Sequence, residues 1–300
     1  MKKIRLNCFD GFRCLSDKCE ETCCKGWEIT VDDETYEKYV GLNDEFSKRI
    51  TGEIKRDRRG YVFKNKNGKC PFLNENGLCD VQSRLGEDYL SAVCYNHPRF
   101  FVDFGNVREI TYSFSCPKVC DMLLGFDGDL DFTETNDGEI VINDVDAKKY
   151  SDSAILRKEI FKIITTGETT DEIFTSAYRA CGLKRKKPNA KKLLKRLLKC
   201  DIYNQELKNA IKSGLNNEKL NVAGFEFQRL KRVIVAVTFR YFLELSYYES
   251  TKKALDFIYK VITYAEILSV YLGEKKTLIY FSKEILHDEN NIKKIRRRQL

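Results

Sequence analysis

The thiol groups in the first 120 residues are the part of this sequence best suited to chemistry. Ten of the twelve cysteines of the 300-residue chain lie there. Eight of them fall in short phrases with acidic and turn residues, namely Cys14, Cys19, Cys23, Cys24, Cys70, Cys79, Cys94 and Cys116. Because cysteines of a hydrophobic core are seldom paired at such short spacing, the pattern indicates metal ligands rather than buried, inert thiols.

The number of thiols leaves several metal sites open. Soft thiolates select zinc, copper(I) or iron–sulfur clusters. Eight thiols exceed the four ligands of one tetrahedral zinc site, so they would fill one four-cysteine cluster with some to spare, or two sites. Cys23 and Cys24 are adjacent, and neighbours in sequence rarely both reach one small site. The spacing does not select four ligands from the eight.

The N-terminus and the apolar stretches bear on where the protein works. Two lysines, Lys2 and Lys3, are followed by no apolar segment of the kind found in a secretory signal. We therefore expect a cytoplasmic protein, in whose reducing surroundings cysteines indicate metal or redox chemistry more than disulfides. The most apolar stretch, Phe225 to Tyr248, is broken by charges, and its uncharged run from Val233 to Phe239 is too short to span a bilayer.

Charge is distributed unevenly along the chain. Residues 1–150 contain 22 Lys and Arg against 28 Asp and Glu, whereas residues 151–300 contain 31 against 17. A basic second half would suit nucleic acid, an anionic surface or an acidic protein, but it also suits the solvated faces of amphipathic helices. The basic run from Lys293 to Arg298 has no aromatic residues within it, so we expect a frayed terminus and not a nucleic-acid partner.

The elements that must position the thiols are short. We expect a helix capped by Asp32, a strand at 61–63, and a tight loop that returns Cys79 towards Cys70. A helix over 81–95, a hairpin over 99–111 and a helix opened by Pro117 would follow.

The rest of the chain has a different character. Residues 125–147 contain eight carboxylates and no Lys or Arg, which is typical of a linker or a solvent-facing flap. Beyond it, apolar residues recur at helical spacing in five segments, 154–165, 171–181, 190–200, 225–247 and 253–272. We therefore predict a mainly α fold with a cysteine-rich metal-binding domain of little regular structure and short hairpins at 1–125, a linker or flap at 126–150 and a helical bundle at 151–300.

Several motifs in matching order resemble the flagellin lysine-N-methylase family, which is related to proteins with a zinc- or iron-chelating cysteine-rich domain. The motifs are Phe12-Arg13-Cys14, the run from Cys19 to Trp27, Cys70-Pro71-Phe72-Leu73, Leu78-Cys79, Leu85-Gly86-Glu87, Cys94 with Pro98-Arg99, and Ser115-Cys116-Pro117. The similarity covers about residues 4–125 and continues more weakly into the helical part. Several ordered motifs are more specific than one isolated motif.

The resemblance implies methyl transfer from S-adenosylmethionine to lysine side chains of flagellin by a protein that carries an iron–sulfur cluster, with [4Fe–4S] as the expected type and zinc as the alternative. Its metal ligands would come from the same eight cysteines. Cys8, Cys120, Cys181 and Cys200 match nothing in the family and are expected to be ordinary thiols. His97 stands where the family usually has an aromatic residue, so it is not expected to bind the metal.

Two other residues are candidates for contact with the methyl donor. Arg99 could form a two-pronged hydrogen bond with the donor's carboxylate, or a structural salt bridge near the metal loop. Trp27, the sole tryptophan, is expected to shield the metal site from water in preference to stacking on adenine.

The sequence contains neither a glycine-rich dinucleotide turn nor the cysteine spacing of a radical S-adenosylmethionine enzyme, so it does not show a donor site. The main rival hypothesis is a non-catalytic module that binds zinc or iron.

Overall fold

The computed structural model describes residues 1–58, 60–136, 145–217 and 224–296, which are mainly helical. The chain divides into two compact units. We call Met1–Phe12, Phe101–Ser115 and Val119–Leu300 the helical unit, and Arg13–Phe100 with Cys116–Lys118 the cysteine unit. This division differs from the predicted boundaries at residues 125 and 150, because the first strand and the hairpin belong with the helices.

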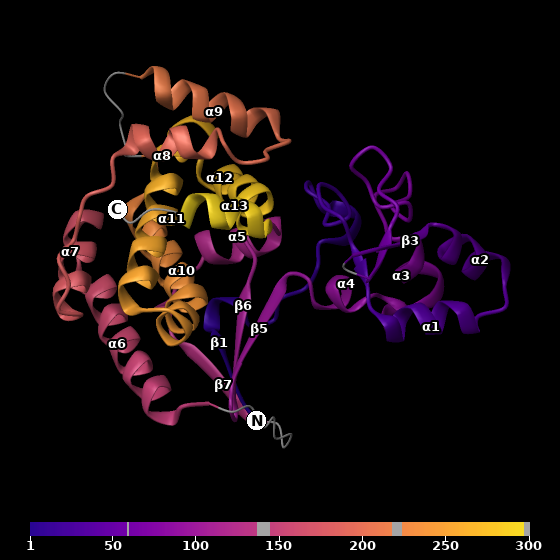
Figure 1. Cartoon of the computed structure of the whole chain (residues 1–300), viewed down its shortest axis with the longest axis horizontal. Helices are drawn as coiled ribbons and strands as arrows, with labels where there is room; N and C mark the ends of the chain where they lie inside the picture. The colour runs from indigo at the N-terminus through magenta and orange to yellow at the C-terminus, as the bar shows by residue number, and fades with distance from the viewer. Residues whose placement is uncertain (59, 137–144, 218–223, 297–300) are drawn as a thin grey trace. The chain divides into compact units, whose positions relative to one another are not determined.

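A four-stranded sheet lies at one side of the helical unit (Figure 1). Its order is β5-β6-β1-β7, formed by β5 (Arg99–Phe104), β6 (Val107–Tyr112), β1 (Lys2–Leu6) and β7 (Phe132–Asn136). β1 runs parallel to β6, with Lys3 opposite Arg108, and antiparallel to β7, with Ile4 opposite Glu134. The chain therefore leaves the sheet after β1, builds most of the cysteine unit and returns through β5.

Two sequence predictions meet their outcome in this sheet. The predicted hairpin is confirmed as β5 and β6, joined at Gly105, whose φ of +59° is a value that glycine adopts without strain. The prediction of a linker or flap over 126–150 is wrong for Phe132–Asn136, which forms the edge strand β7, and for the end of the segment, where a helix begins at Ala147. Residues 137–144 lie outside the described part of the chain.

Helices fill the remainder of this unit. They are α5 (Pro117–Leu124), α6 (Ala147–Thr166), α7 (Thr170–Ala180), α8 (Ala190–Leu197), α9 (Gln205–Asn216), α10 (Phe227–Tyr248), α11 (Thr251–Leu272), α12 (Glu274–Phe281) and α13 (Glu289–Arg296), with a π-helical turn at Ser282–Leu286 between the last two. All five helices predicted beyond residue 150 are confirmed as α6, α7, α8, α10 and α11. Three further helices, α9, α12 and α13, were not predicted.

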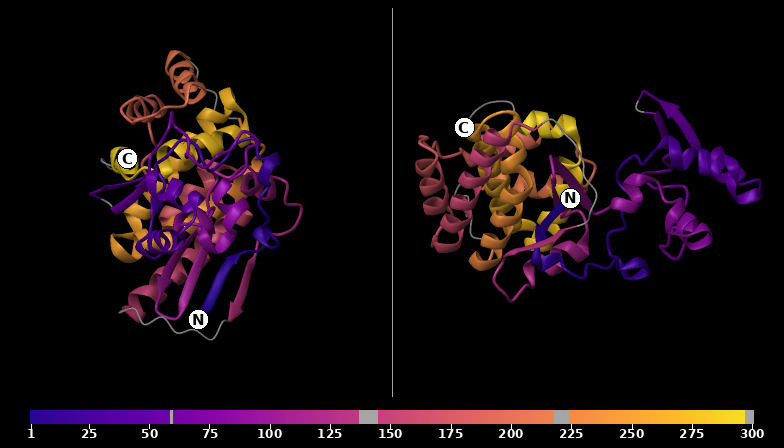
Figure 2. Two further views of the ribbon diagram at one scale, coloured as in Figure 1. Left: turned by 90° about the vertical axis from the view of Figure 1, so that its right-hand side faces the viewer. Right: turned by 90° about the horizontal axis from the view of Figure 1, so that it is seen from below.

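The core of the helical unit forms around α10 and α11, whose side chains are buried on nearly every face. α6 packs along α10, and both lie against the sheet, as the two further views also show (Figure 2). Phe132 of β7 contacts Phe161 of α6 and Phe239 of α10 at ring distances of 5.3 and 5.1 Å. Beside them the buried Arg157 donates to the buried Glu109 carboxylate.

The cysteine unit has more regular structure than predicted. It contains a three-stranded antiparallel sheet of order β2-β4-β3 and four short helices. These elements are β2 (Thr30–Val31), α1 (Asp33–Gly41), α2 (Glu45–Gly52), β3 (Ile54–Asp57), β4 (Gly60–Phe63), α3 (Asp80–Leu85) and α4 (Ala92–Asn96). The predicted helix over 81–95 is wrong, since α3 ends at Leu85 and the φ of +90° at the next residue, Gly86, is outside the helical region.

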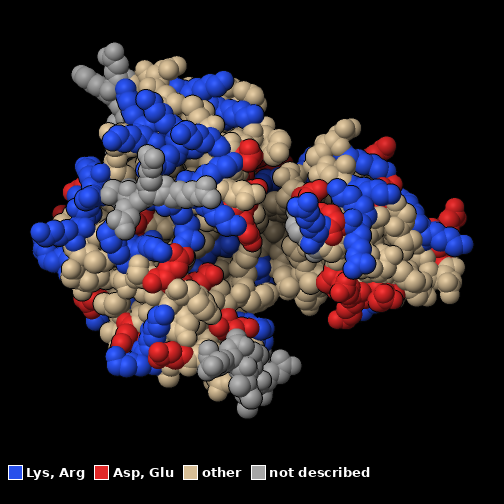
Figure 3. All heavy atoms as spheres, in the orientation of Figure 1, with Lys and Arg blue, Asp and Glu red and all other residues tan. Residues whose placement is uncertain are grey.

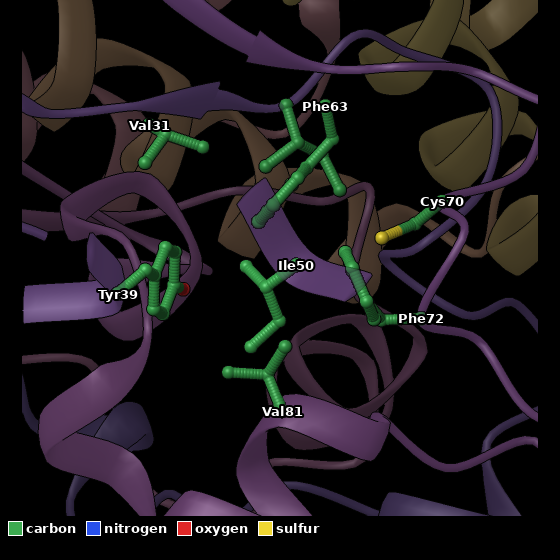
Figure 4. Packing of buried hydrophobic residues seen from close by; sticks show 8 residues of the cluster. Val31, Tyr39, Ile50, Phe63, Cys70, Phe72 and Val81 are labelled. Atoms are coloured by element: carbon green, nitrogen blue, oxygen red, sulfur yellow. The ribbon is translucent and has the colours of Figure 1, made fainter. Parts of the chain in front are cut away.

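A small apolar core holds this unit together. Tyr39, Ile50, Phe63, Phe72 and Val81 come from different elements and are almost fully buried. Cys70 lies at the edge of this cluster beside Phe72 (Figure 4). The partly buried side chains that pack against the same cluster include three more thiols, Cys24, Cys79 and Cys94. The hydrophobic core therefore places four thiols along one border.

Within the described ranges, no helix is both long enough and apolar enough to cross a membrane.

Candidate metal centre

Backbone pairing brings Cys24 and Cys70 together. The amide of Cys70 donates to the carbonyl of Cys24 at 2.8 Å, and the amide of Gly26 donates to the carbonyl of Gly68 at 2.9 Å. Lys25 and Lys69 form an isolated antiparallel bridge between these two bonds. Two segments distant in sequence thus lie side by side, with a cysteine in each.

The tight loop predicted between Cys70 and Cys79 is confirmed. Asn74 initiates it, because its side-chain oxygen accepts from the amides of Asn76 and Leu78 at 3.0 Å each. Gly77 has a φ of +76°, and a bridge between Leu73 and Cys79 closes the loop. Cys79 therefore returns to the neighbourhood of Cys70.

Cys94 is placed by helix α4 and by a contact with α1. The Asp32 carboxylate accepts from the amide of Thr35 at 3.0 Å, which caps α1, and from the amide of Ala92 at 2.7 Å, which begins α4. One carboxylate therefore fixes the starts of both helices. This second contact of Asp32 has no signature in the sequence, although its role as the cap of α1 was predicted.

Three thiols, those of Cys23, Cys70 and Cys79, interact with Cys24. Its pKa is lowered by hydrogen bonds from the thiol of Cys23, then from those of Cys70 and Cys79. The hydrogen bond to Cys24 is the main cause that raises the pKa values of those three. Burial adds to the increase at Cys70 and Cys79, whereas Cys23 is exposed. The sulfurs can thus share one negative charge, while each further charge is opposed by the first. A soft cation would remove this opposition, since thiols that bind a metal lose their protons.

Backbone amides support two of these sulfurs. The amide of Phe72 lowers the pKa of Cys70 through a hydrogen bond. The amide of Gln82 lowers the pKa of Cys79, which precedes α3, although it does not complete a capping hydrogen bond. Amide groups directed at sulfur favour the thiolate, which is the form that binds metal.

Cys94 lies within electrostatic range of this group. Burial raises its pKa to about 11, while the nearby Ser91 hydroxyl opposes the increase. Ser91 is only 1% exposed, and its oxygen lacks the geometry of a hydrogen bond with any group in the described chain. Ser91 was not predicted from the sequence, where a serine before a short helix indicates only a cap.

The other predicted ligands are placed less closely. Cys14 is exposed, accepts from the amide of Ser16 at 3.4 Å, and lies near enough to raise the pKa of Cys23. The half-buried Cys19 thiol donates to the Glu21 carbonyl at 3.4 Å. Cys116 is half-buried and precedes α5. Both belong to the cysteine unit.

The contacts do not amount to a coordination site. In the part of the chain that the structure describes, no three His, Cys, Asp or Glu side chains are arranged to hold a metal ion. Cys23, Cys70 and Cys79 instead share contacts with Cys24. The residues nevertheless fit a thiophilic metal or cluster in their chemistry, because four soft donors converge and the unsatisfied Ser91 hydroxyl stands beside a fifth.

The two predicted donor contacts occupy different settings. Trp27 is partly buried against the core that carries the thiols, and its ring lies 5.4 Å from that of His97. The His97 ring thus contacts an aromatic side chain. Arg99 is half-buried at the start of β5.

The four remaining cysteines all belong to the helical unit. Burial raises the pKa of Cys8 to about 12 and that of Cys200 to about 11. The buried Cys120 thiol donates to the Phe114 carbonyl at 3.1 Å, and burial also raises the pKa of the half-buried Cys181. Thiols react as thiolates, and burial keeps these thiols protonated, so their surroundings are those of inert cysteines.

Part of the chain is similar to three proteins of known name. It is 32% identical over 120 residues to the flagellar biosynthetic protein FliU of Salmonella muenchen, a match that covers 38% of this chain and 71% of that protein. Over 120 residues it is also 32% identical to the lysine-N-methylases of Salmonella typhimurium and Salmonella choleraesuis, but this match covers 30% of each.

No family model and no solved structure matches the chain. The match to FliU nevertheless spans more than two thirds of that protein at appreciable identity, and the lysine-N-methylases match over the same length of sequence. The chain belongs to the flagellin lysine-N-methylase family.

Proposed function

We propose that the protein is a protein-lysine N-methyltransferase that transfers a methyl group from S-adenosylmethionine to lysine side chains of flagellin. Two relatives carry the name lysine-N-methylase, and a third is named a flagellar biosynthetic protein. The chain spans less than a third of the two named methylases, so the activity and the substrate are inferences from a shared segment.

The proposal includes a metal centre in the cysteine unit. The observation that carries it is the convergence of Cys23, Cys70 and Cys79 on Cys24, with Cys94 nearby. An iron–sulfur cluster takes four cysteine thiolates, so this group can supply its ligands, while zinc would use the same donors. Cys23, Cys24, Cys70 and Cys79 would hold such a cluster, which would order the surrounding loops.

The remaining tasks fall to protein side chains. A lysine amine with a pKa near 10.4 is protonated at neutral pH, so the site must remove a proton and align the nitrogen with the methyl group. Trp27, which packs against the same core as the thiols, would exclude water from them. Arg99 would hold the carboxylate of the donor, as its forked guanidinium suits.

Methyl transfer should be measured with anaerobically purified protein, flagellin and isotope-labelled S-adenosylmethionine, and the labelled residues mapped by mass spectrometry. We expect label on lysine side chains with wild type and with Cys181→Ser, and a large loss with Cys24→Ser. Wild-type protein that is loaded with metal but transfers no label would contradict the proposal.

A non-catalytic metal module is the second candidate, favoured by the limited share of the methylases that the match covers. Calorimetry with S-adenosylmethionine separates the two candidates. The enzyme should bind the donor in its metal-loaded form, whereas the module would retain metal and show no affinity for the donor.

A further inference from the structure

A lysine-rich surface covers the outer side of α8 and the loop before it. No Asp or Glu occurs between residues 173 and 200, whereas ten Lys and Arg do. In Figure 3, blue side chains gather over the part of the helical unit where Figure 1 shows α7, α8 and α9. The exposed lysines here are Lys184, Lys186, Lys187, Lys191, Lys192, Lys195 and Lys199. Lys187 pairs with Asp171, and we call the other six the lysine surface.

The fold explains why these lysines point outwards. α8 buries Leu193, Leu194 and Leu197, each at most 2% exposed, against the helical core. The lysines on the opposite side of the same helix, Lys191, Lys192 and Lys195, therefore face solvent. Asn189 caps the helix by accepting from the amide of Lys192 at 2.9 Å, so the cationic face is held on a regular element.

The helical unit does not neutralise this surface. Asp171 pairs with Arg185 at 2.9 Å and with Lys187 at 3.2 Å, and Arg185 also contacts the hydroxyl of Tyr259. Over the described ranges, by contrast, none of the six lysines of the lysine surface forms an ion pair. The surface thus carries a concentrated positive charge that attracts anions from solution.

Two exposed apolar side chains border the lysine surface. Leu198, at the end of α8, is 46% exposed, and Tyr203, in the following loop, is 82% exposed. The backbone of Tyr203 is fixed by a 2.6 Å hydrogen bond to the Glu284 carboxylate. Tyrosine is enriched in protein interfaces, so Tyr203 would give a docked polypeptide an apolar contact beside the charges.

We infer that the lysine surface docks an acidic segment of the protein substrate. This inference rests on the proposed function. It specifies a substrate that has carboxylates away from the lysine to be methylated. The exposed cations are mainly lysines, since Arg185 is engaged by Asp171 and Arg196 is half-buried. The anionic groups of a protein segment are Asp and Glu carboxylates, and lysine ammonium groups pair with carboxylates as point charges. Complementary charge of this kind chiefly accelerates encounter and selects partners.

The test compares two charge-reversed variants of the full chain. Lys191→Glu/Lys192→Glu/Lys195→Glu alters the lysine surface, and Lys148→Glu/Lys158→Glu/Lys162→Glu makes the same change in net charge on the exposed side of α6. Thermal unfolding by circular dichroism verifies that both fold. Binding to a fluorescent poly-glutamate peptide is then measured at several salt concentrations.

We expect the α8 variant to bind poly-glutamate about tenfold more weakly with a flatter salt dependence, and the α6 variant to bind within about twofold of wild type. With flagellin, the α8 variant should raise KM and leave kcat unchanged. Peptide binding needs no methyl transfer, so it reports on the surface even where the proposed activity fails.

Three results would overturn the inference. Equal weakening in both variants would show a general effect of net charge. Tighter binding to single-stranded DNA or anionic vesicles than to poly-glutamate would assign the surface to another class of partner. A salt-sensitive dimer that the α8 variant abolishes would make a second copy of this chain the occupant.

Discussion

At the scale of single residues, the sequence identified the candidate ligands but could not choose among them. Spacing along the chain put Cys14 and Cys19 on equal terms with Cys24, whereas the contacts make Cys24 the common partner of three thiols. That choice depends on the pairing of residues 24–26 with 68–70, which joins distant segments. The buried Ser91 beside Cys94 likewise depends on tertiary packing.

The buried ion pair between Arg157 and Glu109 offers a test of the helical core. Arg157 also donates to the Phe239 carbonyl at 3.3 Å, so it links β6, α6 and α10. Arg157→Ala would leave Glu109 charged and unpaired in the interior. We expect a loss of about 3–5 kcal/mol in the free energy of unfolding, measured with urea.

The exposed pair Lys148–Asp152, at 3.0 Å, is the control for that experiment. Lys148→Ala should scarcely move the urea midpoint, because exposed pairs are screened by solvent. Similar losses in both variants would show that burial does not set the strength of the Arg157 pair.

Glu266 gives the stability of the helical unit a pH dependence. Burial raises its pKa to about 7, against an opposing 2.8 Å hydrogen bond from the Thr170 hydroxyl. Because the folded protein holds this proton more tightly than the unfolded chain does, the contribution is fully present below the unfolded pKa of 4.5 and is lost as pH rises through about 7.

Between about pH 5 and about pH 8, the free energy of unfolding of wild type should fall by a contribution from Glu266 on the order of 2 kcal/mol. Glu266→Gln should lack this contribution. Urea unfolding at both pH values provides the measurement. Parallel pH profiles for wild type and variant would refute this role of Glu266.

Among the elements, apolar periodicity and capping residues predicted most helices. They failed for a short strand and for a helix that is interrupted. The long helices α10 and α11 follow directly from apolar periodicity. β1 was missed because its five residues, Lys2–Leu6, are mostly charged and gain their pairing from β6 and β7, which lie more than 100 residues away. A continuous helix over 81–95 was predicted because one glycine does not interrupt a helical pattern in the sequence. The prediction failed because Gly86 adopts a φ of +90°, which ends the helix.

The cap residue Asp32 carries a prediction at this scale. It accepts hydrogen bonds at the starts of α1 and α4, whereas Asp44 caps only α2, by accepting from Ser47 at 2.7 Å. Asp32→Ala should destabilise the cysteine unit by about 2 kcal/mol, and Asp44→Ala by about 1 kcal/mol. The order of the two losses is measured by urea unfolding, and a reversed order would show that the contact with Ala92 contributes little.

At the scale of the whole molecule, the two units have separate cores and should respond differently to metal removal. The cysteine unit is small and borders its core with thiols, while the helical unit is built around α10 and α11. Calorimetry should show that a chelator lowers the temperature of one unfolding transition and leaves the other unchanged. A uniform shift of the entire profile would contradict this separation.

Metal binding by the thiols around Cys24 can be measured from the metal and sulfide content and the visible spectrum of protein purified without oxygen. We predict brown wild-type protein and Cys181→Ser with iron and sulfide in equal amounts, and colourless, folded Cys24→Ser with little of either. Colourless wild-type protein with zinc would keep the site and replace the cluster. Folded wild-type protein without any bound metal would show that the thiols around Cys24 do not form a metal centre.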